Sequence, residues 1–243
     1  MSVKKEKRMG IKENLLNIRK TISECAIKSG RGENDVKLVA VSKFHPAESV
    51  LEAISCGQLL FGENRVQEAA AKFDFVRSTG AEPSLHIIGS LQRNKVKEAV
   101  RIASCIESLD RIELADEIEK QCAKIGKKID VLLEIHTGEE SKSGFSSEED
   151  VALVLEKCAA GEYGHIVPKG FMTMAPNTDD ESLVRKSFSY LRELRGRMSS
   201  RFPSLSLSEL SMGMSGDYEI AISEGATIVR IGTAIFGQRD YSK

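Results

Sequence analysis

The sequence has no excess of charge of either sign, and this absence excludes several classes of partner. Its 35 Lys and Arg residues nearly balance 36 Asp and Glu residues along 243 positions. No global field therefore attracts nucleic acid, an anionic membrane or a cationic partner. We predict no nucleic-acid partner and no membrane partner, so any binding has to come from a local site.

Cysteine is sparse, and long apolar segments are missing. The five cysteines are widely spaced and form no Cys-x-x-Cys pair, which is typical of reduced thiols in the cytoplasm. The charged N-terminus is not followed by the apolar region of a signal peptide, and no run of roughly 18 apolar residues occurs. We therefore expect a cytoplasmic protein with no secretion signal, no membrane span and no metal site.

The chain contains an alternation of apolar runs and charged, periodic segments. Residues 11–29 place apolar side chains three and four positions apart, which predicts a leading helix that ends before Gly30. Eight short apolar runs follow, at 38–42, 59–62, 85–89, 105–109, 131–135, 170–174, 210–214 and 227–232. Segments with helical periodicity separate most of these runs, including 111–124 and 179–198.

This alternation predicts the fold class. Apolar strands separated by amphipathic helices are typical of the α/β class, with a parallel sheet covered by helices. Eight such units in about 200 residues suit one (β/α)₈ TIM barrel, to which the leading helix is an addition. An open doubly wound sheet is the alternative. We expect a single domain over residues 1–243, with residues 1–10 disordered.

Lys43 directly follows the first apolar run. Barrel enzymes carry their working residues at the carboxyl ends of the strands, so this position is a candidate active site. Burial lowers the pKa of a lysine, and the neutral amine is a nucleophile that forms Schiff bases with carbonyl compounds. A solvated lysine at the end of the strand is the alternative interpretation. Lys43 therefore requires support from elsewhere in the chain.

That support comes from the loops after the last two predicted strands. Ser215 and Gly216 follow the seventh run, and Gly232 and Thr233 follow the eighth. In barrels these two loops, with the N-terminus of a short extra helix, commonly bind a phosphate through backbone N–H groups. Each glycine alone would indicate only a turn, whereas the pair of loops favours a phosphate site.

Arg230 lies within the eighth run, two residues before Gly232. By strand alternation it points either inward with Gly232 or outward with Ile231. An inward arginine needs a partner, and the ring nitrogen of a cofactor such as pyridoxal 5′-phosphate (PLP) would provide one. A salt bridge with a carboxylate such as Glu63 is the other interpretation. Asn64, after the second run, is expected either near the cofactor ring or bonded to its own backbone.

Several motifs together resemble the pyridoxal phosphate homeostasis protein family, whose members are similar to the N-terminal barrel of alanine racemase standing alone. The similarity extends over about residues 11–240. It is carried by LVAVSK (38–43), FGENRVQE (61–68), HIIGSLQRNK (86–95), GEESKSGF (138–145), GFMTM (170–174), LSMGMSGDYEIAI (210–222) and VRIGTAIFG (229–237). Any of these motifs alone is weak, whereas their combination is specific.

The resemblance implies a PLP-binding barrel of the fold-type III group. In that interpretation Lys43 holds PLP as a Schiff base, and Arg230 faces the pyridine nitrogen. Ser215 and the amides of Gly232 and Thr233 would bind the phosphate. An arginine beside the ring nitrogen does not stabilise a protonated pyridine, so it makes PLP a weaker electron sink than a carboxylate partner would.

Other residues of these motifs are expected to border the open side of the site, without an assignable role. They are His86, Gln92, Asn94, Lys95, Lys142 and Gly144, the last two in the loop 137–147. A histidine at the start of a strand is more often a structural partner than an acid or base.

The chain departs from the commoner family pattern at three positions. Glu134 and His136 stand where Gln and Asn are frequent, and Arg65 stands where Tyr is frequent. These differences concern contacts on the ligand side and leave the cofactor residues unchanged.

Three functions fit the sequence. The first is a PLP homeostasis protein, expected as a monomer, that keeps, delivers or senses PLP and has PLP-dependent apo-enzymes as partners. Alanine racemase takes a tyrosine base from a second domain of its partner subunit, and we expect this chain to lack that domain, so binding is favoured over turnover. The second is a low-activity PLP-dependent amino-acid racemase that uses Lys43 alone. The third is a cofactor-free barrel lyase whose lysine forms a Schiff base with a sugar phosphate.

Overall fold

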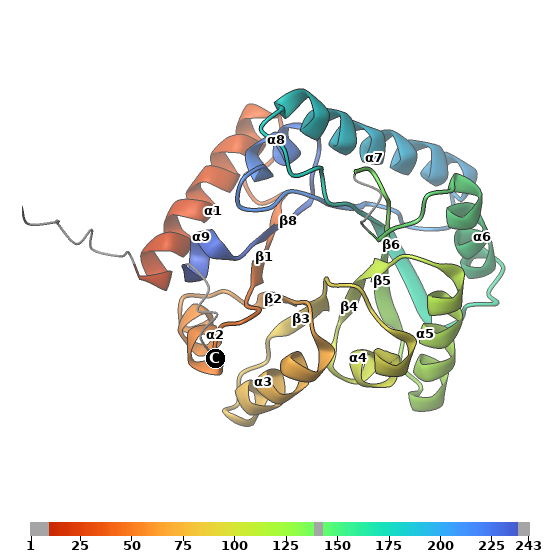
Figure 1. Cartoon of the computed structure of the whole chain (residues 1–243), viewed down its shortest axis with the longest axis horizontal. Coiled ribbons are helices and arrows are strands. Elements are labelled where there is room, and N and C mark those ends of the chain that lie inside the picture. Colours follow the sequence, from red (N-terminus) through yellow and green to blue (C-terminus); the bar gives the residue numbers. More distant parts are fainter. Residues whose placement is uncertain (1–9, 139–142, 238–243) are drawn as a thin grey trace, which may run out of the picture.

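Each predicted apolar run forms a parallel strand, and the eight strands close into a barrel in the computed structural model, which describes residues 10–138 and 143–237 (Figure 1). The strands are β1 (Lys37–Val41), β2 (Leu60–Glu63), β3 (Ser84–Ile87), β4 (Cys105–Leu109), β5 (Ile129–Glu134), β6 (Ile166–Met172), β7 (Glu209–Ser211) and β8 (Ile228–Ile231). Strand order follows chain order, so the (β/α)₈ prediction is confirmed.

Helices surround the barrel as an outer ring (Figure 1). They are α1 (Ile11–Lys28), α2 (Ala47–Ser55), α3 (Val66–Ser78), a 3₁₀ turn at Arg93–Lys95, α4 (Val96–Ile102), α5 (Ile112–Ile125), α6 (Glu148–Ala159), α7 (Glu181–Arg201), α8 (Tyr218–Ser223) and α9 (Thr233–Phe236). The predicted helices at 11–29, 111–124 and 179–198 are confirmed as α1, α5 and α7.

The first and last strands close the barrel. β1 pairs with β2 on one side and with β8 on the other, from Lys37 opposite Ile228 to Ala40 opposite Ile231. An open doubly wound sheet would leave β1 and β8 without this pairing, so that alternative is wrong. Closure brings the residues after β1 beside those after β8, which the predicted site requires.

Helix α1 covers the seam between the two ends of the barrel. Its buried positions Leu15, Ile18, Ile22 and Ala26 repeat at spacings of three and four, as the sequence indicated. On the same helix Asn14 donates a hydrogen bond from Nδ2 to the carbonyl of Ile235 in α9, at 2.8 Å. The leading helix therefore packs onto the structure formed by the end of the chain.

Strand β6 begins earlier than predicted, at Ile166 instead of residue 170. The polar Lys169 and the proline at 168 interrupt the apolar run, which is why the pattern indicated a later start. The register of β5 and β6 shifts next to Pro168, between Val131 and Leu132. Proline has no N–H for the ladder and is tolerated at such irregularities.

Two apolar layers result from strand alternation. Most buried side chains lie between the strands and the outer helices, whereas a smaller set fills the barrel interior. The interior set is Val39, Val41, Cys105, Leu132, Met172 and Ile228. Within the ranges described, no helix combines the length and the apolar character that a membrane crossing needs.

Candidate functional site

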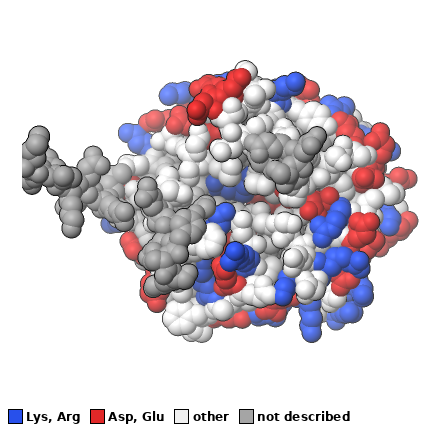
Figure 2. All heavy atoms as spheres, in the orientation of Figure 1, with Lys and Arg blue, Asp and Glu red and all other residues white. Residues whose placement is uncertain are grey.

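A cavity of about 240 Å³ opens where the strands end at their carboxyl side. It is lined by Val41, Lys43, Asn64, Ile88, Met174, Met214, Ser215, Gly216, Arg230, Gly232 and Thr233. All six residues that the sequence proposed for cofactor binding are in this set. Their strands lie at both ends of the chain, so only the closed barrel brings them together. Positive and negative side chains are interspersed around the rim of this face of the molecule (Figure 2).

A buried ion pair fixes the backbone next to Lys43. Lys72 donates from Nζ to Oε1 of Glu63 and to the carbonyl of Ser42, each at 2.8 Å. Ser42, which is fully buried, donates its hydroxyl to the same carboxylate oxygen at 2.7 Å. Strand β1, strand β2 and helix α3 are thus joined at the residue before Lys43. The half-buried lysine emerges from a rigid base into the cavity.

The residue after Lys43 has an unusual backbone. Phe44 adopts φ of 65°, the left-handed region, which costs a residue other than glycine roughly 1–3 kcal/mol. The guanidinium of Arg65 lies 5.5 Å from the centre of its ring, in a cation–π contact. Such strain is concentrated at functional sites because the surrounding structure has to impose it.

The loops after β7 and β8 form one wall of the cavity. Ser215 and Gly216 come from the first loop, and Gly232 and Thr233 from the second. A Cβ atom on Gly232 would lie 3.0 Å from the carbonyl oxygen of Val41, so this loop approaches β1 more closely than a side chain allows. The first N–H groups of a helix have no partners within it, and α9 starts at Thr233; the later N–H groups, those of Ile235 and Phe236, already donate to the carbonyl of Gly232. The wall suits an anion.

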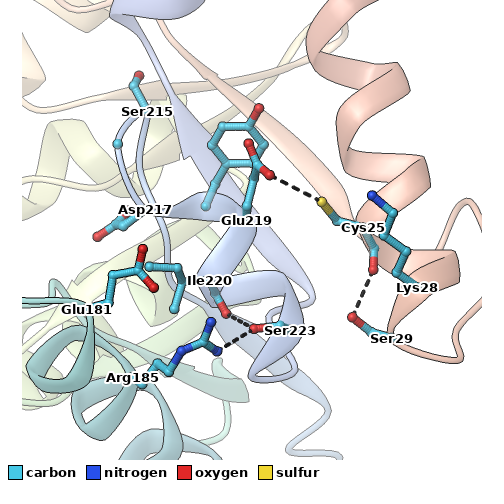
Figure 3. Close-up of a pocket in the computed structure, with 12 residues that line it drawn as sticks. Cys25, Lys28, Ser29, Glu181, Arg185, Ser215, Asp217, Glu219, Ile220 and Ser223 are labelled. Atoms are coloured by element: carbon cyan, nitrogen blue, oxygen red, sulfur yellow. Dashed lines mark hydrogen bonds between the residues drawn. The ribbon is translucent and has the colours of Figure 1, made fainter.

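The same loop separates this cavity from another one. Ser215 and Gly216 also line a cavity of about 460 Å³ between α1, α7 and α8. Figure 3 shows Ser215 at its edge, the thiol of Cys25 directed at the carboxylate of Glu219, and Arg185 directed at Ser223. The loop that contains Ser215 and Gly216 is thus a shared wall of these two cavities, with one cavity on each side.

Arg230 points into the barrel, which settles the choice that strand alternation left open. It is buried; Nη1 donates to Oγ of Ser211 at 2.7 Å, and Nη2 donates to the carbonyl of Thr173 at 2.8 Å. Burial lowers the pKa of Arg230, and the carboxylate of Glu107, 3.9 Å from Nη1, opposes that effect. The carboxylate partner is Glu107 instead of Glu63, because Glu63 is taken by Lys72.

Asn64 faces the cavity without a hydrogen bond at its buried Oδ1 atom. The alternative, a bond from Asn64 to its own backbone, does not involve this oxygen. A Cβ atom at Gly89 would lie 2.7 Å from the carbonyl oxygen of Asn64, so glycine at that position permits the close packing of the two loops. An unsatisfied buried acceptor is costly and calls for a partner.

Two groups of motif residues lie away from this cavity. His86 lines a cavity of about 470 Å³ at the opposite mouth, with Lys37 and Glu209 at the starts of β1 and β7, so its expected place on the open side is wrong. Gln92 and Asn94 are exposed. The residues that line the 240 Å³ cavity do not include Gln92, Asn94, Lys95 or Gly144. Lys142 lies outside the described residues.

The departures from the family pattern lie at the end of β5 and the start of α3. Glu134 is buried, accepts a hydrogen bond from Ser143 at 2.8 Å, and has no partner at Oε2. Burial raises the pKa of Glu134. Gly144 has φ of 129° and packs against the backbone of His136, which brings the loop 143–147 over this carboxyl group.

Sequence reasoning did not identify Glu107. It lies fully buried in the barrel, where it contacts His86, Ser211 and Arg230. The available signal was a glutamate in the middle of an apolar strand, Cys105–Leu109, where every residue is buried. A charge at such a position requires specific partners.

Comparisons with known proteins agree with this geometry. The family model of the alanine racemase N-terminal domain matches residues 12–240. The pyridoxal phosphate homeostasis protein of Aquifex aeolicus is 41% identical over 94% of this chain and 98% of the relative. The protein of the same name from Pasteurella multocida is 37% identical over 97% of this chain and 100% of the relative.

Solved structures extend the comparison. PipY from Synechococcus elongatus, a structure with PLP bound, has a TM-score of 0.82 and 32% identity over 93% of this chain and 100% of that chain. Alanine racemase from Clostridium difficile, in complex with cycloserine, shares the fold at a TM-score of 0.74 and 16% identity, over 96% of this chain and 60% of that chain. By sequence and by fold, this chain belongs to the alanine racemase N-terminal domain family, among the pyridoxal phosphate homeostasis proteins.

Proposed function

We propose that this chain binds pyridoxal 5′-phosphate in the 240 Å³ cavity, as a Schiff base on Lys43, and acts in PLP homeostasis. The observation that carries the proposal is the convergence of an amine, an arginine and two glycine-containing loops on one cavity. The relatives' names and the PLP bound to PipY support it.

The residues present fit this cofactor. The cavity is smaller than the roughly 300 Å³ at which pockets for drug-sized ligands begin, as suits a ligand with one ring. The unpartnered Oδ1 of Asn64 offers an acceptor to a ligand hydroxyl. Gly232 packs closely on β1, because a Cβ atom there would lie 3.0 Å from the carbonyl oxygen of Val41, and its backbone lines the cavity.

Each residue then has a distinct task. Lys43 would supply the amine that holds the aldehyde carbon, and Arg230 would lie beside the ring nitrogen. Ser215, with the amides of Gly232 and Thr233, would bind the phosphate. Bound PLP supplies an electron sink for amino-acid chemistry. An arginine beside the ring nitrogen would disfavour its protonation, which makes PLP a weaker electron sink for carbanion chemistry.

Binding without rapid turnover is the better-supported activity. Two-base racemisation needs a second acid–base group on the other side of the substrate carbon. Within the described part of the chain, no tyrosine lines the cavity. Tyr163 donates to Asp116, Tyr190 donates to Glu148, Tyr218 lines the cavity of Figure 3, and Tyr241 lies outside the described residues. A low-activity racemase that uses Lys43 alone is the second candidate, favoured only by that amine.

A cellular role forms the second part of the proposal. We place the protein in the cytoplasm as a monomer that keeps PLP bound and passes it to apo-enzymes or senses its level. A lysine-bound aldehyde is shielded from other amines yet can be released by exchange, which suits storage and delivery.

The test is the visible spectrum of purified protein with added PLP, followed by borohydride reduction and peptide mapping. We expect a Schiff-base band, and label on Lys43 that is absent in Lys43→Ala. Wild-type protein that stays colourless with excess PLP would overturn the proposal. Borohydride trapping only with a sugar phosphate present would then indicate the cofactor-free lyase.

The racemase alternative has its own assay. Multiple turnovers in the loss of optical rotation from alanine or serine, abolished in Lys43→Ala, would establish it. Without turnover in PLP-loaded protein, binding is the function.

A further inference from the structure

The barrel interior holds a chain of polar groups that the proposed function does not yet use. Glu107 is at its centre, in β4, with no exposed surface. Its Oε1 lies 2.6 Å from Nδ1 of His86, and its Oε2 accepts from the hydroxyl of Ser211 at 2.5 Å. Ser211 in turn accepts from Nη1 of Arg230 at 2.7 Å. The chain reaches from the mouth lined by His86 to the cofactor cavity lined by Arg230.

The direction of every hydrogen bond in this chain follows from one constraint. Arginine has donors only, so Nη1 of Arg230 must donate to Ser211. The hydroxyl proton of Ser211 is then available to Glu107, whose Oε2 accepts it. With Glu107 ionised, the proton between its Oε1 and His86 resides on Nδ1. An ionised Glu107 therefore orients Ser211, and Ser211 orients Arg230.

The balance of effects keeps Glu107 ionised. Burial by itself would raise the pKa of Glu107, but the hydrogen bonds from His86 and Ser211 and the charge of Arg230 outweigh it, so the pKa lies below its usual value. Other charged groups act on Arg230, at one end of this hydrogen-bonded series. Arg230 is also under the influence of Glu134 and Asp217.

At the His86 end of this hydrogen-bonded series, positive and negative side chains balance. His86 shares its cavity with two cation–carboxylate pairs and a thiol, so no single sign dominates there. These groups are Lys37 with Glu209, Lys169 with Asp130, and Cys105.

Stability alone does not account for such a series of buried polar side chains. TIM-barrel interiors are usually filled with Val, Ile and Leu side chains. Replacing a buried ion pair by apolar residues of similar volume is often neutral or stabilising, because desolvation offsets the attraction between the charges. Glu107 and Arg230 nevertheless occupy the interior, at 0% and 4% exposure. A requirement for a fixed guanidinium at the cavity explains their presence.

We propose that Glu107 is a positioning residue that acts through Ser211 to hold the guanidinium of Arg230 toward the ring nitrogen of the cofactor, with His86 as its support at the opposite mouth. The inference rests on the proposed function, since Arg230 is the member that reaches the cofactor. Removing the charge of Glu107 weakens its hydrogen bond from Ser211 and its attraction for Arg230, so the guanidinium is held less firmly and keeps only its hydrogen bond to the carbonyl of Thr173 at full strength.

The experiment compares Glu107→Gln with Glu162→Gln, a change at an exposed glutamate, in PLP-reconstituted protein. We expect Glu107→Gln to retain borohydride-trappable PLP on Lys43, to bind PLP about tenfold more weakly, and to shift the visible absorption maximum. Glu162→Gln should match wild type in all three. A spectrum and affinity of Glu107→Gln identical to those of Glu162→Gln would overturn the inference while leaving the proposed function intact.

Two further pairs keep the test informative if Glu107→Gln folds poorly. Ser211→Thr retains the hydroxyl, whereas Ser211→Ala removes it; we expect the spectral shift only in the alanine variant. His86→Asn presents an amide N–H close to the position of Nδ1, whereas His86→Leu does not; we expect the asparagine variant to restore the wild-type maximum. Equal spectra within both pairs would contradict the role of the chain. If wild type binds no PLP, the proposed function itself fails, which is a separate outcome.

Discussion

Nζ of Lys72 lies 2.8 Å from Oε1 of Glu63 and 2.8 Å from the carbonyl oxygen of Ser42, so one ammonium group joins α3, β2 and the end of β1. Both charged side chains are shielded, with 10% of Lys72 and none of Glu63 exposed. The backbone that carries Lys43 is thus fixed by charges outside the cavity.

Lys72→Met should destabilise the protein by about 3–5 kcal/mol, because it leaves the Glu63 carboxylate buried without its cation. Urea unfolding followed by circular dichroism measures this loss. The double variant Glu63→Gln with Lys72→Met removes both charges and should recover most of it. A single variant as stable as wild type would contradict the importance of the pair.

Gly232→Ala should cost about 1–3 kcal/mol of folding stability and weaken PLP binding, since the new methyl group meets the carbonyl oxygen of Val41 at 3.0 Å. Gly216→Ala is the matched control in the same cavity wall, where a Cβ atom meets no protein atom within 4 Å. Thermal unfolding of the two variants without PLP separates backbone crowding from effects on the ligand. Equal melting temperatures would argue against crowding at Gly232.

The buried carboxyl group of Glu134 makes folding stability depend on pH, in a direction that its pKa shift determines. Burial raises its pKa in the folded protein above that of the unfolded chain. The folded state then binds the proton more tightly, so the contribution of Glu134 to stability is full below the unfolded pKa and is lost as the pH rises through the folded value.

Glu134→Gln should therefore change stability little at about pH 4 and raise it relative to wild type at about pH 7, since a neutral amide carries no charge to desolvate. Urea midpoints of both proteins at the two pH values test this sign. A larger advantage of the variant at the lower pH would contradict it.

The thiol of Cys158 should be slow to alkylate in the folded protein. Burial, with a further contribution from Glu119, raises the pKa of Cys158 to about 12, and the thiolate is the reactive form. We expect its iodoacetamide rate, followed by peptide mass spectrometry, to keep rising between about pH 8 and pH 10. The denatured protein is the control, in which the rate should level off near the ordinary pKa of about 8.5. Levelling off in the folded protein would argue against the shift.

The fold was predictable because the periodicity of apolar residues in strands and helices indicates which of their faces are buried. The meeting of Lys43 with Arg230 was predictable for the same reason, since closure of an eight-stranded barrel places the first strand beside the last. The glutamate within an apolar run marked Glu107 as unusual, but its partners could not be predicted, because they come from β3, β7 and β8 and no short-range pattern relates those strands.

His86 shows why depth within the barrel is hard to predict. His86 lies in β3 and Ile88 directly follows that strand, two positions later, yet Ile88 lines the cofactor cavity and His86 lines the opposite one. Alternation distinguishes the inside from the outside of a barrel. The level along the barrel axis depends on the stagger between strands, which a single sequence does not display.

The closure of β1 on β8 also sets the time at which the site forms during synthesis. The contact between Asn14 and Ile235 joins residues 221 positions apart, and the cavity takes its walls from the same two ends of the chain. A nascent chain on the ribosome possesses Lys43 long before Arg230 and the β8 loop emerge. Until then Lys43 lacks the walls of its cavity, so under the proposed function PLP would meet its complete site only after the barrel has closed.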